Sequence, residues 1–136
     1  MPHVAEARVV DFDADAAVDG LRAAVGDYLG AVAEYDRETP HLLYASDVVL
    51  ELFDGIDSLE AFTADFHGHV AHDFYERELF RDFVPMSNDV NGFVTRMDNA
   101  VIVRYLVGDQ GLFVSTEPTA SIDAIFDVLD RTAGQD

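Results

Sequence analysis

The chain has 136 residues, no cysteine, and 27 acidic residues against eight basic ones, for a formal net charge of −19 at pH 7. The lack of cysteine excludes disulfides, thiolate metal sites and cysteine nucleophiles. So acidic a chain repels nucleic-acid phosphates and anionic membrane surfaces, and we therefore exclude nucleic acid and membrane as direct partners. The length predicts a single domain over residues 1–136, and a hydrophobic fraction of 49% argues against disorder.

The basic residues are all arginine, and lysine is absent. We interpret this composition as adaptation to high salt, because at molar ionic strength the Debye length falls to about 3 Å and self-repulsion is screened. Binding of a basic partner is the alternative. No apolar run approaches the roughly 20 residues that span a bilayer. Because the first six residues also lack the features of a signal peptide, we expect a cytoplasmic protein.

In chain order, residues 1–14 are predicted to be a flexible tail with a short apolar segment able to dock on the domain. Residues 16–35 predict a helix, because apolar side chains recur there at three- and four-residue steps. Asp13 or Asp15 is its expected N-terminal cap. Two glycines four residues apart near its end indicate either a tolerated, solvated helix face or close packing at a dimer seam.

Residues 41–45 predict a buried strand beside the sheet formed later in the chain. Residues 48–53 are ambiguous, because periodicity alone does not separate short apolar runs. Their β-branched start favours a second strand, which we prefer. The alternative is one or two helical turns capped by Asp47.

Residues 57–60 have the spacing of a capping box, with a glutamate three residues after an aspartate. They predict a long helix from Ser58 to about Phe80 or Phe83, followed by a loop over 81–91. The predicted buried stripe of this helix is Leu59, Phe62, Phe66, Val70, Phe74 and Phe80.

Residues 92–116 predict three antiparallel strands, and residues 118–131 predict a closing helix with Pro118 in its first turn. Two-residue links at 98–99 and 109–110 fix the register of the two hairpins. The predicted cross-strand pairs are Met97 with Ala100, Val94 with Val103, Val107 with Leu112 and Tyr105 with Val114.

Both faces of this three-stranded segment are apolar. One face carries Val94, Val101, Val103, Tyr105, Val107, Leu112 and Val114. The other carries Phe93, Met97, Ile102, Leu106 and Phe113, with Thr95, Arg104 and Ser115 among them. A half-solvated sheet would show one polar face. We therefore expect cover on both faces, from helices of this chain or from a second subunit.

This order of elements, over about residues 17–132, resembles the roadblock / dynein-light-chain-like domain of small-GTPase regulators. The stretches that carry the resemblance are 41–47, the helix from Ser58, 100–107, Gly108–Asp109, and 112–115 running into a helix at about Pro118. The resemblance implies an α+β, roadblock/profilin-like fold with a central antiparallel sheet of about four to five strands and helices on both faces. It also implies dimers through the long middle helix and a sheet edge, and a scaffolding or switch-protein-binding role. Residues 88–131 also resemble small uncharacterised proteins of halophilic archaea.

One histidine-rich segment could bind a metal ion. On a continuous helix His69 and His72 are one turn apart, and Asp65 and Glu76 fall on the same flank. Two imidazoles and a carboxylate can bind zinc or iron, and His41 could add a ligand from the neighbouring strand. The alternative, which we favour, is a solvated polar flank with helical histidine–carboxylate pairs.

Arg96 and Arg104 interrupt otherwise apolar strands. Each could bind a carboxylate, a phosphate or an acidic side chain of a partner, or could form an ion pair within the sheet. Nucleophile-elbow, P-loop and dinucleotide-binding motifs are all absent from the sequence, and no cofactor is expected.

The function these features favour is a non-enzymatic, homodimeric regulatory or scaffolding module, whose further partner could be a small GTPase. The alternatives are a small-ligand sensor domain, which would need a cavity of roughly 300 Å³ or more, and a metal-binding protein or metal-dependent enzyme that uses the helix of His69 and His72.

Overall fold

The computed structural model describes residues 1–83 and 89–134. Its elements are β1 (His3–Val4), α1 (Ala14–Val25), the 3-10 turn η1 (Gly26–Tyr28), β2 (Leu29–Asp36), β3 (Pro40–Ala45), α2 (Asp47–Leu52), α3 (Ile56–Val70), α4 (His72–Phe83), β4 (Gly92–Arg96), β5 (Val101–Val107), β6 (Gln110–Thr116) and α5 (Ile122–Thr132). Of the loop predicted over 81–91, residues 81–83 belong to α4 and residues 84–88 lie outside the described residues. No helix in the described ranges is long and apolar enough to cross a membrane.

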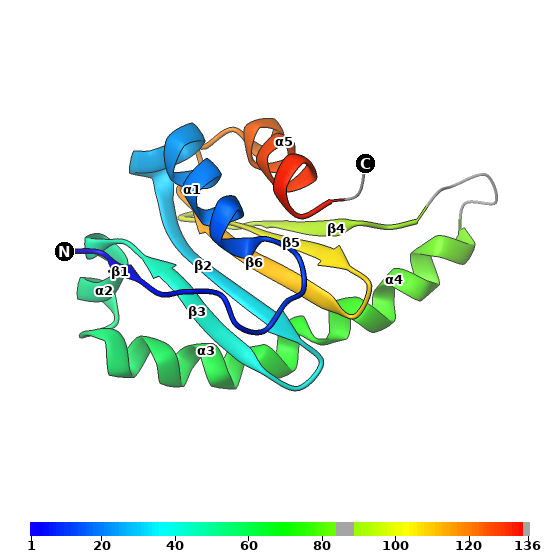
Figure 1. Ribbon diagram of the computed structural model, residues 1–136, viewed down its shortest axis with the longest axis horizontal. Helices are drawn as coiled ribbons and strands as arrows, with labels where there is room; N and C mark the ends of the chain where they lie inside the picture. The colour runs from blue at the N-terminus through cyan, green and yellow to red at the C-terminus, as the bar shows by residue number, and fades with distance from the viewer. Residues whose placement is uncertain (84–88, 135–136) are drawn as a thin grey trace.

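The strands form one antiparallel sheet in the order β1-β3-β2-β6-β5-β4 (Figure 1). Helices lie on both sides of it, so the predicted α+β class is confirmed. The described sheet has six strands, one more than the upper end of the prediction. Two of the six strands were not predicted: β2, and β1, which pairs only His3 and Val4 with the end of β3.

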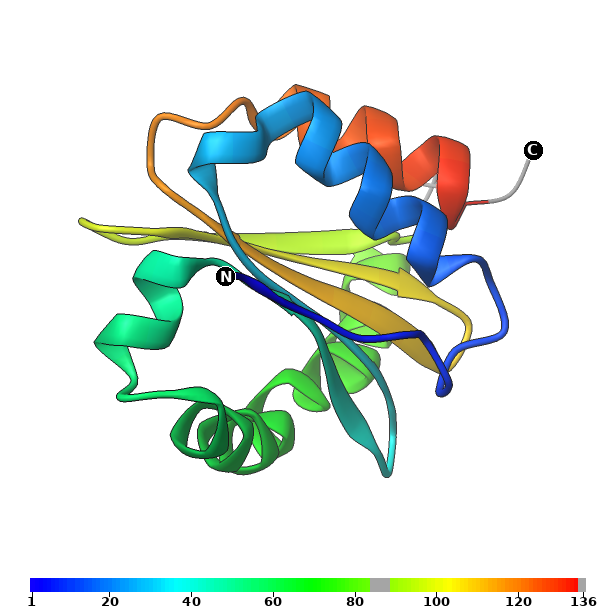
Figure 2. The same ribbon diagram turned by 60° about the vertical axis from the view of Figure 1, so that its left-hand side comes forward.

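The two faces are covered by different helices, as the turned view shows (Figure 2). Helices α1 and α5 pack on one face, over buried residues that include Val101, Val103 and Val114. Helices α2, α3 and α4 cover the other face, where Leu106 is buried and Phe93 and Phe113 are half-buried. The prediction that both faces need cover is therefore confirmed, and this chain supplies helices for both.

The register of the first hairpin is confirmed, and that of the second is wrong. Val94 lies opposite Val103, and the Met97 amide donates to the Ala100 carbonyl at 2.8 Å. In the second hairpin Tyr105 lies opposite Leu112, and the two-residue turn is Gly108–Asp109. Gly108 has φ +59°, which glycine adopts without steric cost, so the chain turns one residue earlier than predicted. Each residue of β5 therefore pairs with a residue of β6 two positions earlier than predicted. A shift of two residues leaves every side chain on its predicted face of the sheet.

The helix predicted over 16–35 is wrong beyond Val25, because Leu29–Asp36 is the strand β2. This strand lies between β3 and β6 in the sheet, and residues 31–35 are all buried. A strand buried on both faces shows no polar alternation, and its apolar residues happened to continue the helical spacing of α1. Gly26 begins η1 and Gly30 lies at a β-bulge, so neither lies on a helix face at a dimer seam.

The segment 48–53 is helical, not a strand. The Ser46 hydroxyl caps α2 by accepting the Val49 amide at 3.2 Å, and this favourable N-cap prevails over the β-branched residues. The strand predicted at 41–45 is confirmed as β3. Its neighbours are β1 and β2, so β2 separates it from the last three strands.

Three helix boundaries also differ from the predictions. Gly55, not Asp57, precedes α3, and the long helix is interrupted between Val70 and His72. Helix α5 begins at Ile122, where the Ser121 hydroxyl accepts the Ala124 amide at 3.1 Å. Pro118 therefore lies in the preceding loop. The cap of α1 is Asp13, as expected.

Candidate functional site

An apolar cleft lies between the sheet and the helices α2 and α3. Its volume is about 780 Å³, well above the size that we required for a ligand cavity. Gly30, Ala31 and Ala33 of β2 contribute very small side chains to the sheet side of the cleft. Leu59, Phe62, Thr63 and Phe66 line it from α3. The space is therefore left where small residues on the sheet face a helix whose side chains do not fill the gap.

The exposed charged side chains of the cleft are acidic and lie at one end, whereas the buried Glu34 also lines the cleft farther along β2, where its carboxylate accepts the amides of residues 8–10. Asp27, Asp47 and Glu117 line it, and all three are exposed. The backbone brings these residues together, because the Glu117 amide donates to the Tyr28 carbonyl at 2.9 Å and the Ser46 amide donates to the Gly30 carbonyl at 2.8 Å. No arginine occurs among the described residues that line the cleft.

The opposite end of the cleft is closed by Tyr35, His67 and Val70. His67 Nε2 donates to the Asp36 carbonyl at 2.8 Å, which leaves Nδ1 as an acceptor. The Tyr35 ring contacts those of His67 and Phe74 edge-on. Burial raises the pKa of the Tyr35 hydroxyl, and the Asp73 carboxylate adds to that rise, so the phenol is neutral at physiological pH.

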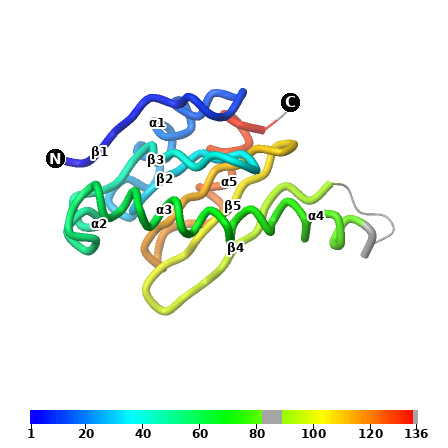
Figure 3. The backbone as a smooth tube through the Cα atoms, turned by 90° about the horizontal axis from the view of Figure 1, so that it is seen from below, coloured from blue at the N-terminus to red at the C-terminus, as the bar shows by residue number. Residues whose placement is uncertain are grey.

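A second candidate surface lies on α4, at the far end of the molecule from α2, and on the strand β4 that runs beside it (Figure 3). Tyr75, Leu79 and Phe80 of α4 are exposed apolar side chains. Val94 of β4 is also exposed, but it lies on the other face of the strand, beside Val103. Phe80 contacts Phe93 edge-on with ring centroids 5.9 Å apart, so helix and strand form one continuous surface. Strand β4 is also an edge of the sheet.

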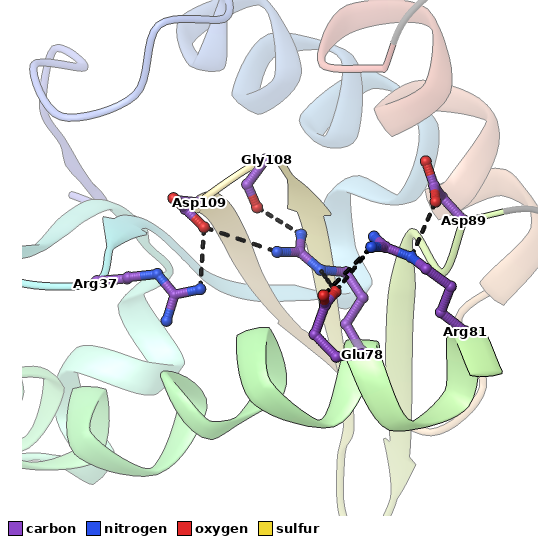
Figure 4. Close-up of polar contacts among 7 residues, drawn as sticks. Arg37, Glu78, Arg81, Asp89, Gly108 and Asp109 are labelled. Atoms are coloured by element: carbon purple, nitrogen blue, oxygen red, sulfur yellow. Dashed lines mark hydrogen bonds and ion pairs between the residues drawn. The ribbon is translucent and has the colours of Figure 1, made fainter. Parts of the chain in front are cut away.

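A cluster of arginines and carboxylates attaches α4 to the turns of the sheet (Figure 4). Asp109, in the β5–β6 turn, accepts from Arg37 of the β2–β3 loop at 3.0 Å. Arg77 of α4 donates to the Gly108 carbonyl, and its guanidinium lies 3.8 Å from the Asp109 carboxylate. Arg81 pairs with Glu78 at 3.0 Å and with Asp89 at 3.1 Å. Because carboxylates neutralise these arginines, we interpret the cluster as structural: it fixes α4 to the β5–β6 turn and to the segment before β4.

Of the two arginines predicted to bind a ligand, the structure places Arg104 in an internal ion pair. Its Nε donates to Asp73 Oδ2 at 2.8 Å, and both side chains are largely buried. Its guanidinium also contacts Thr95 and the Phe93 ring. Arg96 is exposed at the end of β4. The ligand or partner role of both residues stays a prediction.

The two histidines predicted as metal ligands lie on different helices, His69 on α3 and His72 on α4, and His41 lies on β3. His69 and His72 are exposed, and the break at residue 71 removes the continuous helix on which their spacing was based. Within residues 1–83 and 89–134, no group of three or more histidine or acidic side chains is placed to hold a metal ion. Asp65 and Glu76 are exposed as well. The metal site at these four residues stays a prediction.

Sequence reasoning missed two buried carboxylates, that of Asp73 on α4 and that of Glu34 on β2. The Glu34 carboxylate has the larger set of hydrogen bonds. It accepts the amides of Arg8, Val9 and Val10 at 2.7 to 3.0 Å, and His41 Nδ1 lies 2.7 Å away. Burial acts to raise the pKa of this carboxyl, but the hydrogen bonds from His41 and from the three amides outweigh it, so the net pKa is lowered. These contacts hold the N-terminal segment on the sheet. The flexibility predicted for residues 1–14 stays a prediction.

The comparisons with known proteins fit this geometry. The model of the family described as "Domain of unknown function (DUF7522)" matches residues 15–134. The chain belongs to this family. No curated protein matches it.

Several solved structures share the fold. The chain is similar to a Roadblock/LC7 domain from Streptomyces avermitilis, with a TM-score of 0.53 at 13% identity over 76% of this chain and 78% of that one. It is also similar to the gliding protein MglB from Thermus thermophilus, with a TM-score of 0.57 at 14% identity over 94% of this chain and 91% of that one. A structure described as MglB with a tetrameric arrangement gives a TM-score of 0.57 at 13% identity, over 94% and 90% of the two chains. The DUF7522 chain therefore has a roadblock-like fold, as the sequence resemblance implied.

Proposed function

We propose that this DUF7522 protein is a non-enzymatic regulatory or scaffolding module that acts as a homodimer in the cytoplasm of a halophile. The observation that carries the proposal is the surface of α4 and β4. It combines exposed apolar side chains with an open sheet edge, and these are the two features that an antiparallel pairing of two copies would cover.

Two further observations support this assignment. The sheet edge at β4 is opposite the edge occupied by β1, so pairing through β4 would extend the sheet without displacing any described element. The similar MglB structure has a tetrameric arrangement, as its description states, so the fold is compatible with self-assembly.

The matched variants Leu79→Glu and Val48→Glu test the dimer. Both side chains are 64% exposed, but Leu79 lies on α4 and Val48 lies on α2, at the other end of the molecule. A charge at the centre of an apolar interface is costly to bury, so we expect Leu79→Glu to be monomeric and Val48→Glu to remain dimeric. Light scattering in molar KCl measures both masses. A monomeric wild-type protein would disprove the dimer.

The roadblock resemblance implies a small GTPase as a further partner. An exposed cation beside the proposed interface, Arg96, could bind an acidic group of that partner. Calorimetric titration with a small GTPase of the source organism, loaded with GDP or with a GTP analogue, tests this part. We expect binding that differs between the two nucleotide states and weakens in Arg96→Gln. Equal, negligible binding in both states would contradict it.

A further inference from the structure

We propose that the cleft between the sheet and the helices α2 and α3 binds a small amphipathic cation, with an apolar body and a single amine head group. This inference does not depend on the dimer, because the residues that carry it line the cleft from β2, α2 and α3, whereas the proposed interface lies on α4 and β4. The cleft also reaches the β4–β5 turn, at Met97 and Asn99.

The size and chemistry of the cleft are those of a ligand site. Its volume of about 780 Å³ falls within the range of small-molecule pockets, and its lining is mostly aliphatic and aromatic. Its sheet side is formed by the smallest residues of β2, Gly30, Ala31 and Ala33. Larger residues at these positions would fill the space and gain dispersion contacts. The opposite face of the same sheet has such a filled core.

The distribution of charge sets the orientation of the ligand. The three exposed carboxylates of Asp27, Asp47 and Glu117 lie at the end of the cleft where β2 begins. From Gly30 to Tyr35 the lining then extends five residues, or about 16 Å at the usual rise per residue of a strand. Beside this path lie Phe62, Phe66 and other apolar residues of α3. An amine at the acidic end would therefore place its apolar body along β2.

The charged side chains that line this end of the cleft are all carboxylates. No guanidinium lines the described part of the cleft to receive an anion. A ligand carboxylate placed at this end would be repelled by three like charges, whereas an ammonium would be attracted. This asymmetry distinguishes a cationic amphiphile from a fatty acid of the same shape.

Three probes of equal chain length test the proposal: dodecylamine, dodecanol and dodecanoate, each below the concentration at which it aggregates. Titrations are made in about 1 M KCl, where long-range attraction to the whole acidic protein is screened and only local charges discriminate. We expect dodecylamine to bind about tenfold more tightly than dodecanoate, equivalent to about 1.4 kcal/mol, with dodecanol between them. Equal affinities of amine and carboxylate, or no binding of the amine, would overturn the proposal.

Two kinds of variant locate the binding. Asp47→Asn combined with Glu117→Gln removes two exposed charges, so it should keep the affinity for dodecanol and lose most of the preference for the amine. Ala33→Phe should fill the cleft and abolish binding of all three probes, while the melting temperature shows that the variant is folded. Unchanged amine preference in the first variant, or unchanged binding in a folded Ala33→Phe, would contradict the assignment. Light scattering on the same samples measures the molecular mass, so the dimer is tested independently of ligand binding.

Discussion

The two faces of the sheet in this DUF7522 protein are built differently. The face under α1 and α5 is a continuous core in which Leu21, Leu112, Ile125 and Leu129 are fully buried. The face under α2, α3 and α4 has two separate small clusters and a cleft of about 780 Å³. The same strands supply both faces, so strand propensity cannot explain the difference.

The cause lies in which side chains β2 presents to each side. Val32 points to the α1 face with a full-sized apolar group, whereas Ala31 and Ala33 present single methyl groups to the cleft. Helix α4 is attached to the second face by ion pairs and by contacts around Phe74. One face is thus specified by packing, and the other leaves room for a ligand and depends more on polar contacts. Four predictions test this contrast.

A large effect is expected from breaking the ion pair that attaches α4. Asp73→Ala leaves the Arg104 guanidinium largely buried without its carboxylate, and we expect the free energy of unfolding to fall by about 3 kcal/mol. Chemical denaturation in molar KCl measures this loss. Asp65→Ala, at an exposed position on α3, is the control and should change the stability by no more than about 0.5 kcal/mol. Similar losses in both variants would show that the attachment is not polar.

Two matched leucines compare the faces directly. Leu21→Ala removes a fully buried side chain from the filled core and should cost about 2–5 kcal/mol. Leu59→Ala removes a side chain that already borders the cleft, so it loses fewer contacts, and we expect a cost at or below about 2 kcal/mol. Both values come from the same denaturation assay. A larger cost at Leu59 than at Leu21 would reverse our comparison.

The carboxylate of Glu34 should make stability depend on pH. Because its pKa is lowered in the folded state, its contribution is complete above the usual pKa of glutamate. That contribution is lost as the pH falls through the depressed native value. We expect Glu34→Gln to be less stable than the wild type by about 1–3 kcal/mol at neutral pH, since hydrogen bonds to a charged acceptor are replaced by those to a neutral one.

Unfolding curves between neutral and acidic pH check this prediction. The difference between Glu34→Gln and the wild type should shrink as the pH falls, because protonated Glu34 loses the same charge. If the difference in unfolding free energy between the two proteins stayed constant with pH, the charge of Glu34 would not contribute to stability. His41→Gln, which leaves the three amide donors in place, should show a smaller version of the same trend.

The smallest change in stability is expected from enlarging an alanine that borders the cleft. Ala33→Leu adds methyl groups where space exists, so we expect a change within about 1 kcal/mol of zero. Ala17→Leu makes the same substitution at a fully buried position of the filled core and should destabilise by about 1–3 kcal/mol through overpacking. Equal destabilisation in both would mean that the cleft is closed in solution.

The sequence by itself determined those features that depend on neighbours in the chain. The Asp98–Asn99 turn fixed the register of Val94 against Val103, and the apolar pattern of both faces of β5 and β6 required cover on both sides. The cap at Asp13 and the strand β3 were likewise local signals. The same order of elements carried the resemblance to roadblock domains that the solved structures bear out as a fold.

Only the tertiary structure decided that Leu29–Asp36 is a strand between β3 and β6, because burial on both faces removes the polar alternation that marks a strand. The cleft depends on which residues of β2 and α3 face each other across the interior, and no local pattern encodes that pairing. The acidic end of the cleft joins Asp27, Asp47 and Glu117, which come from three distant parts of the chain. The sequence therefore predicted the sheet and its need for cover, whereas long-range contacts decided how completely each face is filled.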